Sequence, residues 1–247
     1  MLLDKMLDGI PSPARNRVEA TLENVSVMMQ LKSPKVAASM APSAVKGLFL
    51  RQGKHFDSVK MQANHQVHFD LQYGLDFPEM NELYRRAVAN QWDGDRDLDW
   101  STNVDPMNPE IPIVNADFLP FDGLREYGIK LNKKEMAEAN YNMVCWFLSQ
   151  FMHGEQGALY ASAQVTECVK WMDGKLYGAT QVMDEGRHLE VFLRYLDTKL
   201  EKTYQINDNL FVIIDSLLTD SRWDIKFLGM QIMIEGLALG AFSTLHN

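Results

Sequence analysis

Cysteine is scarce in this sequence, which has only Cys145 and Cys168 among its 247 residues. Two cysteines exclude a network of disulfides and a zinc site built on cysteine ligands. Both lie in segments with helical periodicity, where an isolated cysteine is typical of a small buried apolar side chain. We therefore expect a protein of a reducing compartment, the cytoplasm.

Clustered positive charge is also missing. The chain has 24 Lys and Arg against 33 Asp and Glu, which gives a formal net charge of −9. Nucleic-acid binding requires lysines and arginines gathered on one surface, where they neutralise phosphates. No such cluster occurs, so we expect no nucleic-acid partner.

Neither a secretory signal nor a clear membrane span is evident. Acidic residues interrupt the apolar stretch of residues 1–13, whereas a signal peptide needs an unbroken one. The longest apolar run, residues 227–245, contains a single formal charge, Glu235. Because a carboxylate near the centre of a bilayer is costly, we expect a buried helix of a soluble bundle and no membrane partner.

Proline is absent after Pro120, and the character of the sequence changes there. Helical periodicity predicts four helices over residues 132–169, 174–201, 207–219 and 222–246. Long helices joined by short turns are typical of an all-α bundle. Proline breaks divide the earlier sequence into shorter pieces, with one further helix expected at 78–92. We expect residues 1–120 to form an irregular, partly helical N-terminal extension that packs on a bundle of residues 121–247.

Two glutamates occupy positions where apolar side chains are expected. The neighbours of Glu155 at helical spacing are Leu148, Phe151, Met152, Ala158 and Leu159. The predicted face of Glu235 carries Leu228, Ile232, Ala238, Leu239 and Phe242. An ionised carboxylate on an apolar face is costly unless it is paired, hydrogen-bonded or bound to a metal.

A third helix supplies the side chains that would explain these glutamates. Glu185 and His188 lie three residues apart, on one face of the helix predicted over 174–201. A Glu-x-x-His pair that faces glutamates on neighbouring helices is a ligand pattern for two metal ions in a bundle. Carboxylate and imidazole ligands suit iron or manganese better than zinc. The interval from Glu155 to Glu185 allows one helix to run out and the next to return, so that both carboxylates meet. The alternative is a metal-free bundle with satisfied buried carboxylates and a core histidine.

Two further patterns bear on this interpretation. Small residues gather beside the predicted ligands, where they serve either close approach of helices or space for metal and substrate; they are Gly154, Gly157, Gly178, Ala179, Gly186, Gly236 and Gly240. His65 and His68 are spaced like a metal-binding pair, but no carboxylate lies beside them at helical spacing. We interpret this pair as polar residues of an irregular segment.

With these residues the sequence resembles the ferritin-like di-iron carboxylate oxygenase and oxidase superfamily, over about residues 132–247. That superfamily includes hydroxylase large subunits, ribonucleotide reductase small subunits and arylamine N-oxygenases. The resemblance implies that Glu155 is the terminal ligand of a first iron and Glu185 the bridging ligand. It likewise implies that His188 is the imidazole ligand of the first iron and Glu235 the first ligand of the second. Asp184 occupies the position that orients an opposite histidine in such proteins.

The sequence departs from this superfamily at two places. Members carry a second Glu-x-x-His some 30 residues after the equivalent of Glu235, whereas this sequence ends 12 residues later at Asn247. We therefore expect a bundle that lacks its last ligand helix, through truncation or because another chain supplies it. Where the radical-forming ribonucleotide reductase subunits have a tyrosine, this sequence has Phe192, which disfavours a radical generator.

The resemblance implies an oxygen-activating di-iron oxidoreductase of the oxygenase, hydroxylase, N-oxygenase or desaturase type. Its cofactor would be two iron ions, with manganese possible for one or both. Its partners would be dioxygen, a small organic substrate and an external electron donor, a ferredoxin or reductase, because no flavin or nicotinamide motif occurs. A homodimer is the expected assembly. The alternative is a non-catalytic or truncated helical bundle with an incomplete metal site.

Overall fold

The computed structural model describes residues 11–55, 57–108, 113–114, 119 and 121–246. Helices and connecting segments make up this part of the chain, and no strand occurs within it. The all-α class predicted from the sequence is confirmed. Residues 1–10, most of the segment used to argue against a secretory signal, lie outside the described residues.

The chain divides into two compact units. One comprises Met1–Lys60 with Asn207–Ser216, and the other comprises Met61–Ile206 with Leu217–Asn247. This division does not follow the boundary expected at residue 120. Residues 61–108 group with the long helices; the backbone N–H of His68, for example, donates to the carbonyl of Glu167 at 2.9 Å.

The first unit consists of short helices. They are α2 (Ser12–Met29), α3 (Pro34–Ala44), the π-helical turn η1 (Val45–Phe49), the 3₁₀ turn η2 (Gln52–Lys54) and the first part of α7 (Asp208–Thr219). Ala44, Leu48 and Val212 form its small apolar core. Beside this core the Lys46 ammonium donates to the buried Asp215 carboxylate at 2.9 Å.

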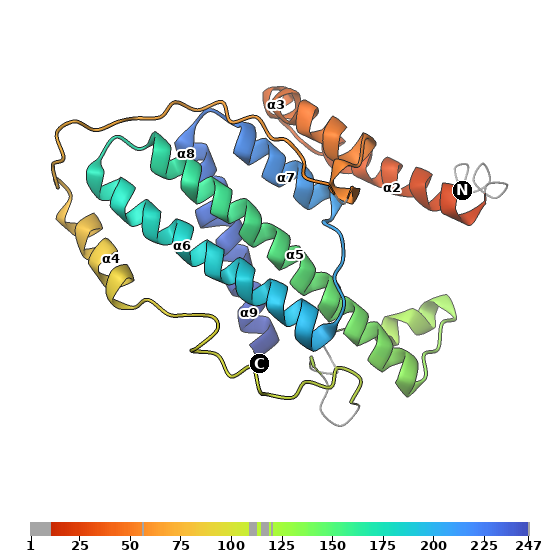
Figure 1. Cartoon of the computed structure of the whole chain (residues 1–247). Helices are drawn as coiled ribbons and strands as arrows, with labels where there is room; N and C mark the ends of the chain where they lie inside the picture. The colour runs from red at the N-terminus through yellow and green to blue at the C-terminus, as the bar shows by residue number, and fades with distance from the viewer. Residues whose placement is uncertain (1–10, 56, 109–112, 115–118, 120, 247) are drawn as a thin grey trace. The chain divides into compact units, whose positions relative to one another are not determined.

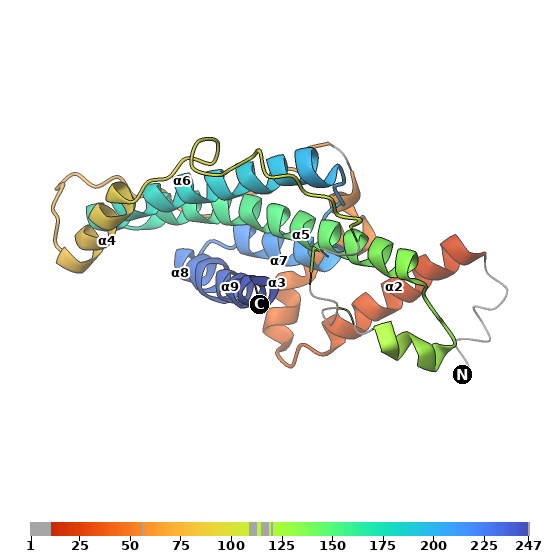
Figure 2. The same ribbon diagram turned by 90° about the horizontal axis from the view of Figure 1, so that it is seen from below.

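The second unit contains the long helices. They are α4 (Pro78–Ala89), the 3₁₀ segment η3 (Phe121–Tyr127), α5 (Lys133–Cys168), α6 (Met172–Tyr195), the π-helical turn η4 (Leu196–Leu200), α8 (Trp223–Lys226), the π-helix η5 (Phe227–Ile234) and α9 (Glu235–His246). Figure 1 shows α5 and α6 antiparallel and side by side, with α4 next to α6. The continuous helix α8–η5–α9 packs on α5 (Figure 2). Helices α5, α6 and α9 thereby position the predicted ligands.

A local sequence signal explains where α5 begins. Asn132 and Glu135 form a capping box, in which the Asn132 side chain accepts from the Glu135 N–H and the Glu135 carboxylate accepts from the Asn132 N–H. A short turn after Cys168 reverses the chain before Met172. The helices predicted over 132–169, 174–201, 207–219 and 222–246, and the helix at 78–92, are confirmed with small shifts at their ends.

The C-terminal helix is much less buried than expected. Its segment Trp223–Ser243 is long and apolar enough to cross a membrane, with a mean hydropathy of 1.4, and 11% of it is buried. Its exposed large side chains are Leu228, Ile232, Met233, Leu237 and Leu239. The expectation of a buried bundle helix is therefore wrong for the part of the helix surface that these exposed side chains form. A single such helix is weak evidence for a membrane span.

Candidate metal centre

Three of the four predicted ligands come together where α5 and α6 face each other. Glu155 lies on α5, and Glu185 and His188 lie one turn apart on α6. The His188 Nδ1 atom is 3.2 Å from a carboxylate oxygen of Glu155 and 3.3 Å from one of Glu185. One ligand atom from each of the three side chains lies within 4.8 Å of the others. This spacing allows all three to contact one metal ion.

The two carboxylates are buried, and the histidine reaches solvent. Glu155 and Glu185 are each 6% exposed, whereas the His188 side chain is 42% exposed. Burial raises the pKa of Glu155. Hydrogen bonds to Glu155 and then to Glu185 raise the pKa of His188 to about 10. Without a metal, an imidazolium therefore neutralises part of the carboxylate charge, and a metal ion would replace its proton.

Glu235 lies near this group but outside it. It begins α9, is half-buried and lines the same pocket as Glu185 and His188. Burial, followed by the charges of Glu155 and Glu185, raises the pKa of Glu235 to about 7. Glu235 is therefore close enough to interact electrostatically with the two carboxylates of the site.

The predicted apolar surroundings of Glu235 are only partly correct. Ala238 and Phe242 are partly buried as expected, but Leu228, Ile232 and Leu239 are exposed. Leu228 and Ile232 lie in the π-helix η5, whose i→i+5 turns change the angular spacing of side chains, whereas Leu239 lies in the regular helix α9. The sequence did not reveal this π-helix, and π-helical segments often adjoin functional sites.

Asp184 has a partner that the sequence analysis did not foresee. It lines the pocket and forms an ion pair with Arg187 on the same helix. We expected Asp184 to orient a histidine on an opposite helix, but the described residues include no such histidine. The i, i+3 spacing of Asp184 and Arg187 is the signal that could have suggested this pair.

Trp92 and Arg187 were both missed as members of the site. The Trp92 ring stacks near His188, with ring centroids 6.1 Å apart and planes at 30°. Arg187 is buried, donates from Nη1 to the Trp92 carbonyl at 2.6 Å and lies over the Trp92 ring. Trp92 lies in the loop just after α4, so the helix predicted over 78–92 could not show that its ring lies beside His188.

A pocket of about 630 Å³ opens beside the ligands. Glu185, His188 and Glu235 form one wall, and residues of α4 together with Trp92 form another. A cavity of this size admits a small organic molecule.

An aromatic cluster packs next to the site. Phe151, Phe192 and Phe242 lie with ring centroids 4.7 to 6.1 Å apart, one from each of α5, α6 and α9. Phe192, the residue found where a radical-forming protein would have tyrosine, therefore has a packing role. Tyr195 packs against the same apolar core as Phe192, and Tyr177 lines the pocket.

The glycines beside the ligands divide into two groups. A methyl group on Gly178 would meet the Thr166 hydroxyl at 2.3 Å, so this glycine allows close approach of α5 and α6. The added methyl would meet nothing within 4 Å at Gly154, Gly186, Gly236 and Gly240. These four positions are open, and close approach of helices does not explain them.

One histidine of the pair in the N-terminal half, His65, contacts a carboxylate. His65 lies in an extended segment, where its Nε2 is 2.6 Å from a carboxylate oxygen of Glu167 on α5. Its side chain is buried, while Glu167 is half exposed. The predicted irregular segment is confirmed, because residues 65–68 belong to no helix or strand. The partner lies 102 residues away in the sequence, so helical spacing could not have shown it.

The donor set fits a metal ion but is small for two. Two buried carboxylates, an imidazole and the nearby Glu235 are hard and borderline donors that iron and manganese accept. A two-metal bundle site ordinarily draws about six side chains from four helices. The described residues offer four side chains from three helices, which suffice for one ion and for part of a two-ion site.

Comparison with known proteins does not extend this description, because no protein-family model, curated protein or solved structure matches the chain.

Proposed function

We propose that this protein is an oxygen-activating di-iron oxidoreductase with a ferritin-like bundle, and that Glu155, Glu185, His188 and Glu235 bind the metal. The observation that carries the proposal is the convergence of two buried carboxylates and an imidazole from adjacent helices, with ligand atoms within 4.8 Å. Two buried carboxylates at such a distance repel each other unless one is protonated or a cation lies beside them, and a divalent metal ion would neutralise both where the imidazolium neutralises one.

The roles of the residues follow from their places. Glu155 and Glu185 supply negative charge from the buried side, and His188 supplies a neutral nitrogen from the solvent side once it loses its proton. When bound there, iron would provide the electrons that reduce dioxygen and the oxidising power that acts on an organic substrate. The adjoining pocket would hold that substrate, and the aromatic cluster of Phe151, Phe192 and Phe242 would exclude water from one side.

Two further elements of the proposal lie outside the four side chains. The chain has no motif for an organic redox cofactor, so an external ferredoxin or reductase would supply electrons. The ligands still needed for a second ion would come from water or from a further protein segment, and a homodimer is the assembly that we propose. Manganese in place of one or both irons fits the same donors.

Reaction with dioxygen tests this proposal. We would load the protein anaerobically with ferrous iron, mix it with oxygenated buffer and follow oxygen consumption with an electrode. Oxygen uptake well above that of free ferrous iron is expected in the wild type and in Glu190→Ala, a change of an exposed glutamate on the same helix. Uptake in Glu185→Ala should fall to the rate of free iron. Equal rates in all three proteins would refute the proposal.

A metal-free structural bundle is the second candidate. It is favoured by the hydrogen bonds of His188 to both Glu155 and Glu185, which partly satisfy the buried carboxylates without a cation. In that case Glu185→Ala would lower stability without changing metal content. The metal-centre proposal expects the variant to change both, so the two measurements together separate the candidates.

A further inference from the structure

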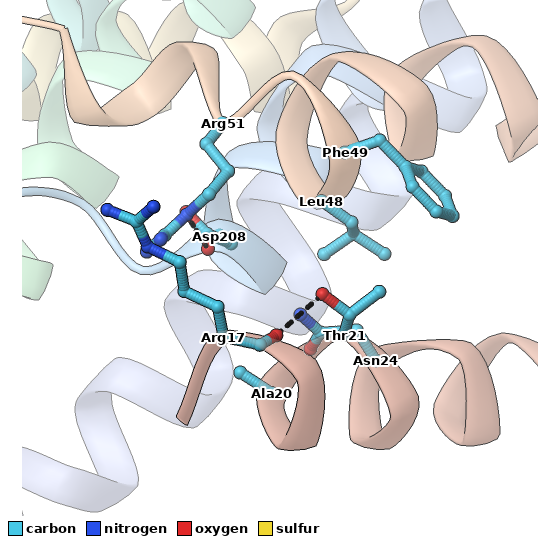
Figure 3. A pocket seen from close by; sticks show the side chains of 8 residues that line it. All are labelled: Arg17, Ala20, Thr21, Asn24, Leu48, Phe49, Arg51 and Asp208. Atoms are coloured by element: carbon cyan, nitrogen blue, oxygen red, sulfur yellow. Dashed lines mark hydrogen bonds and ion pairs between the residues drawn. The ribbon is translucent and has the colours of Figure 1, made fainter. Parts of the chain in front are cut away.

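The first unit has a pocket of its own, with a volume of about 440 Å³ (Figure 3). Two arginines, Arg17 of α2 and Arg51 of the turn before η2, approach it from different elements. Leu48 and Phe49 of η1 form an apolar wall, and Asn24 adds an amide. The combination of cations with an apolar wall is typical of sites for organic anions.

Arg51 has an unusual backbone. Its φ of +50° is in the left-handed region, where a side chain other than that of Asn, Asp or Gly is uncommon. Such a conformation costs about 1 kcal/mol or more, and residues that keep it often serve a site. Here it accompanies an Arg51 side chain that reaches Asp208, with Nε 3.2 Å from a carboxylate oxygen (Figure 3).

The donors of the two arginines are mostly unused. Among the described residues, Arg51 bonds only through Nε to Asp208, which leaves both terminal nitrogens available. The Arg17 guanidinium has no hydrogen bond or ion pair to any described side chain or carbonyl. Guanidinium groups bind phosphate and carboxylate oxygens through paired N–H donors.

Positive charge exceeds negative charge around this pocket. Among the residues that line it, two arginines accompany one carboxylate, Asp208, and Lys54 lies 3.6 Å from that carboxylate. The protein as a whole has a net charge of −9, so the sign of the charge at this pocket is opposite to that of the whole chain. A local excess of one sign attracts ligands of the other sign.

We propose that this pocket binds a small phosphomonoester with an apolar or aromatic body. The phosphate would lie between Arg17 and Arg51, and the body would pack on Leu48 and Phe49. We favour phosphate over carboxylate because a phosphate group has three terminal oxygens, which can accept from both guanidinium groups at once. This site is independent of the proposed metal chemistry, since all of its residues belong to the first unit.

Calorimetric titration of the full chain with phenyl phosphate at low ionic strength tests the proposal. Saturable binding is expected, and it should weaken about tenfold or more in Arg17→Gln, because each charged hydrogen-bond pair contributes about 1.5 kcal/mol or more. Arg15→Gln is the matched control: Arg15 is on the same helix, pairs with Glu19 and does not line the pocket. Its affinity should stay within twofold of the wild type.

A second variant separates binding from folding. Arg51→Gly removes the guanidinium and also relieves the left-handed backbone, so it should abolish binding without lowering the midpoint of thermal unfolding. Inorganic phosphate should bind more weakly than phenyl phosphate, and benzoate more weakly still. The proposal is overturned if phenyl phosphate does not bind, if Arg17→Gln and Arg51→Gly bind it as the wild type does, or if benzoate binds as tightly.

Discussion

At the scale of single residues, burial distinguishes what sequence reasoning could and could not find. Glu155 and Glu185 were predictable because a carboxylate in an apolar helical stripe violates a simple rule. Trp92 was not, because its approach to His188 depends on the path of a loop. The helical spacing of Asp184 and Arg187 was visible in the sequence. Side chains at this spacing can either pair or point into solvent, and periodicity does not show which of the two occurs.

Arg187 offers a test at this scale. The change Arg187→Ala should lower the free energy of unfolding by about 2–3 kcal/mol, because a buried charged donor to the Trp92 carbonyl and its packing are lost. Arg96→Ala removes an arginine from the exposed ion pair with Asp93 and should cost less than about 1 kcal/mol. Urea unfolding followed by circular dichroism gives both values, and equal effects would contradict the role assigned to Arg187.

Asp220 provides a prediction that depends on pH. Its hydrogen bonds with Arg222 lower the pKa of the Asp220 carboxyl below 3.8. The folded-state pKa is depressed, so the stabilisation exists above the unfolded value and is lost as pH falls through the folded one. Wild type should exceed Asp220→Asn in unfolding free energy by about 1 kcal/mol or less at pH 7.

The difference between these two proteins should vanish at a pH below the folded-state pKa of Asp220. Thermal unfolding midpoints of both, measured from pH 7 down to the acid limit of folding, show this convergence. A constant difference across that range would exclude the carboxylate charge as its cause.

At the scale of elements, the positions of the helices could be predicted from the sequence. Whether a helix is an α-helix or a π-helix could not. Periodicity and the absence of proline sufficed to locate α5, α6, α7 and the helix from α8 to α9. The π-helical geometry of η5 was hidden, because it changes hydrogen bonding without changing the apolar composition on which periodicity rests. The predicted apolar face of Glu235 was wrong for Leu228 and Ile232 in η5 and also for Leu239 in α9, because all three are exposed.

Gly178 and Gly186 form a matched pair within α6. Gly178→Ala should lower the free energy of unfolding by about 1–2 kcal/mol, because the new methyl group collides with Thr166 on α5. Gly186→Ala should raise it by about 0.5–1 kcal/mol, because the methyl group meets open space and alanine favours a helix. Chemical denaturation of both variants checks the signs. A stabilising Gly178→Ala would show that α5 and α6 are not in close contact there.

At the scale of the whole molecule, the chain combines two units whose pockets differ in charge. The pocket of the larger unit contains buried carboxylates, and that of the smaller unit contains arginines. The all-α class was predictable from proline placement and periodicity. The division into units was not, because residues 207–216 join a unit formed mainly from the first 60 residues, and only tertiary contacts reveal such a grouping.

The central claim is that Glu155, Glu185, His188 and Glu235 hold iron. The most direct test is the iron content per chain after anaerobic loading with ferrous iron and removal of unbound metal. We predict about two irons per chain in the wild type and in Glu190→Ala, and their loss in Glu185→Ala. One iron per chain, also lost in Glu185→Ala, would support the ligands and contradict a di-iron centre. Iron in the wild type no higher than in Glu185→Ala would contradict the metal centre itself.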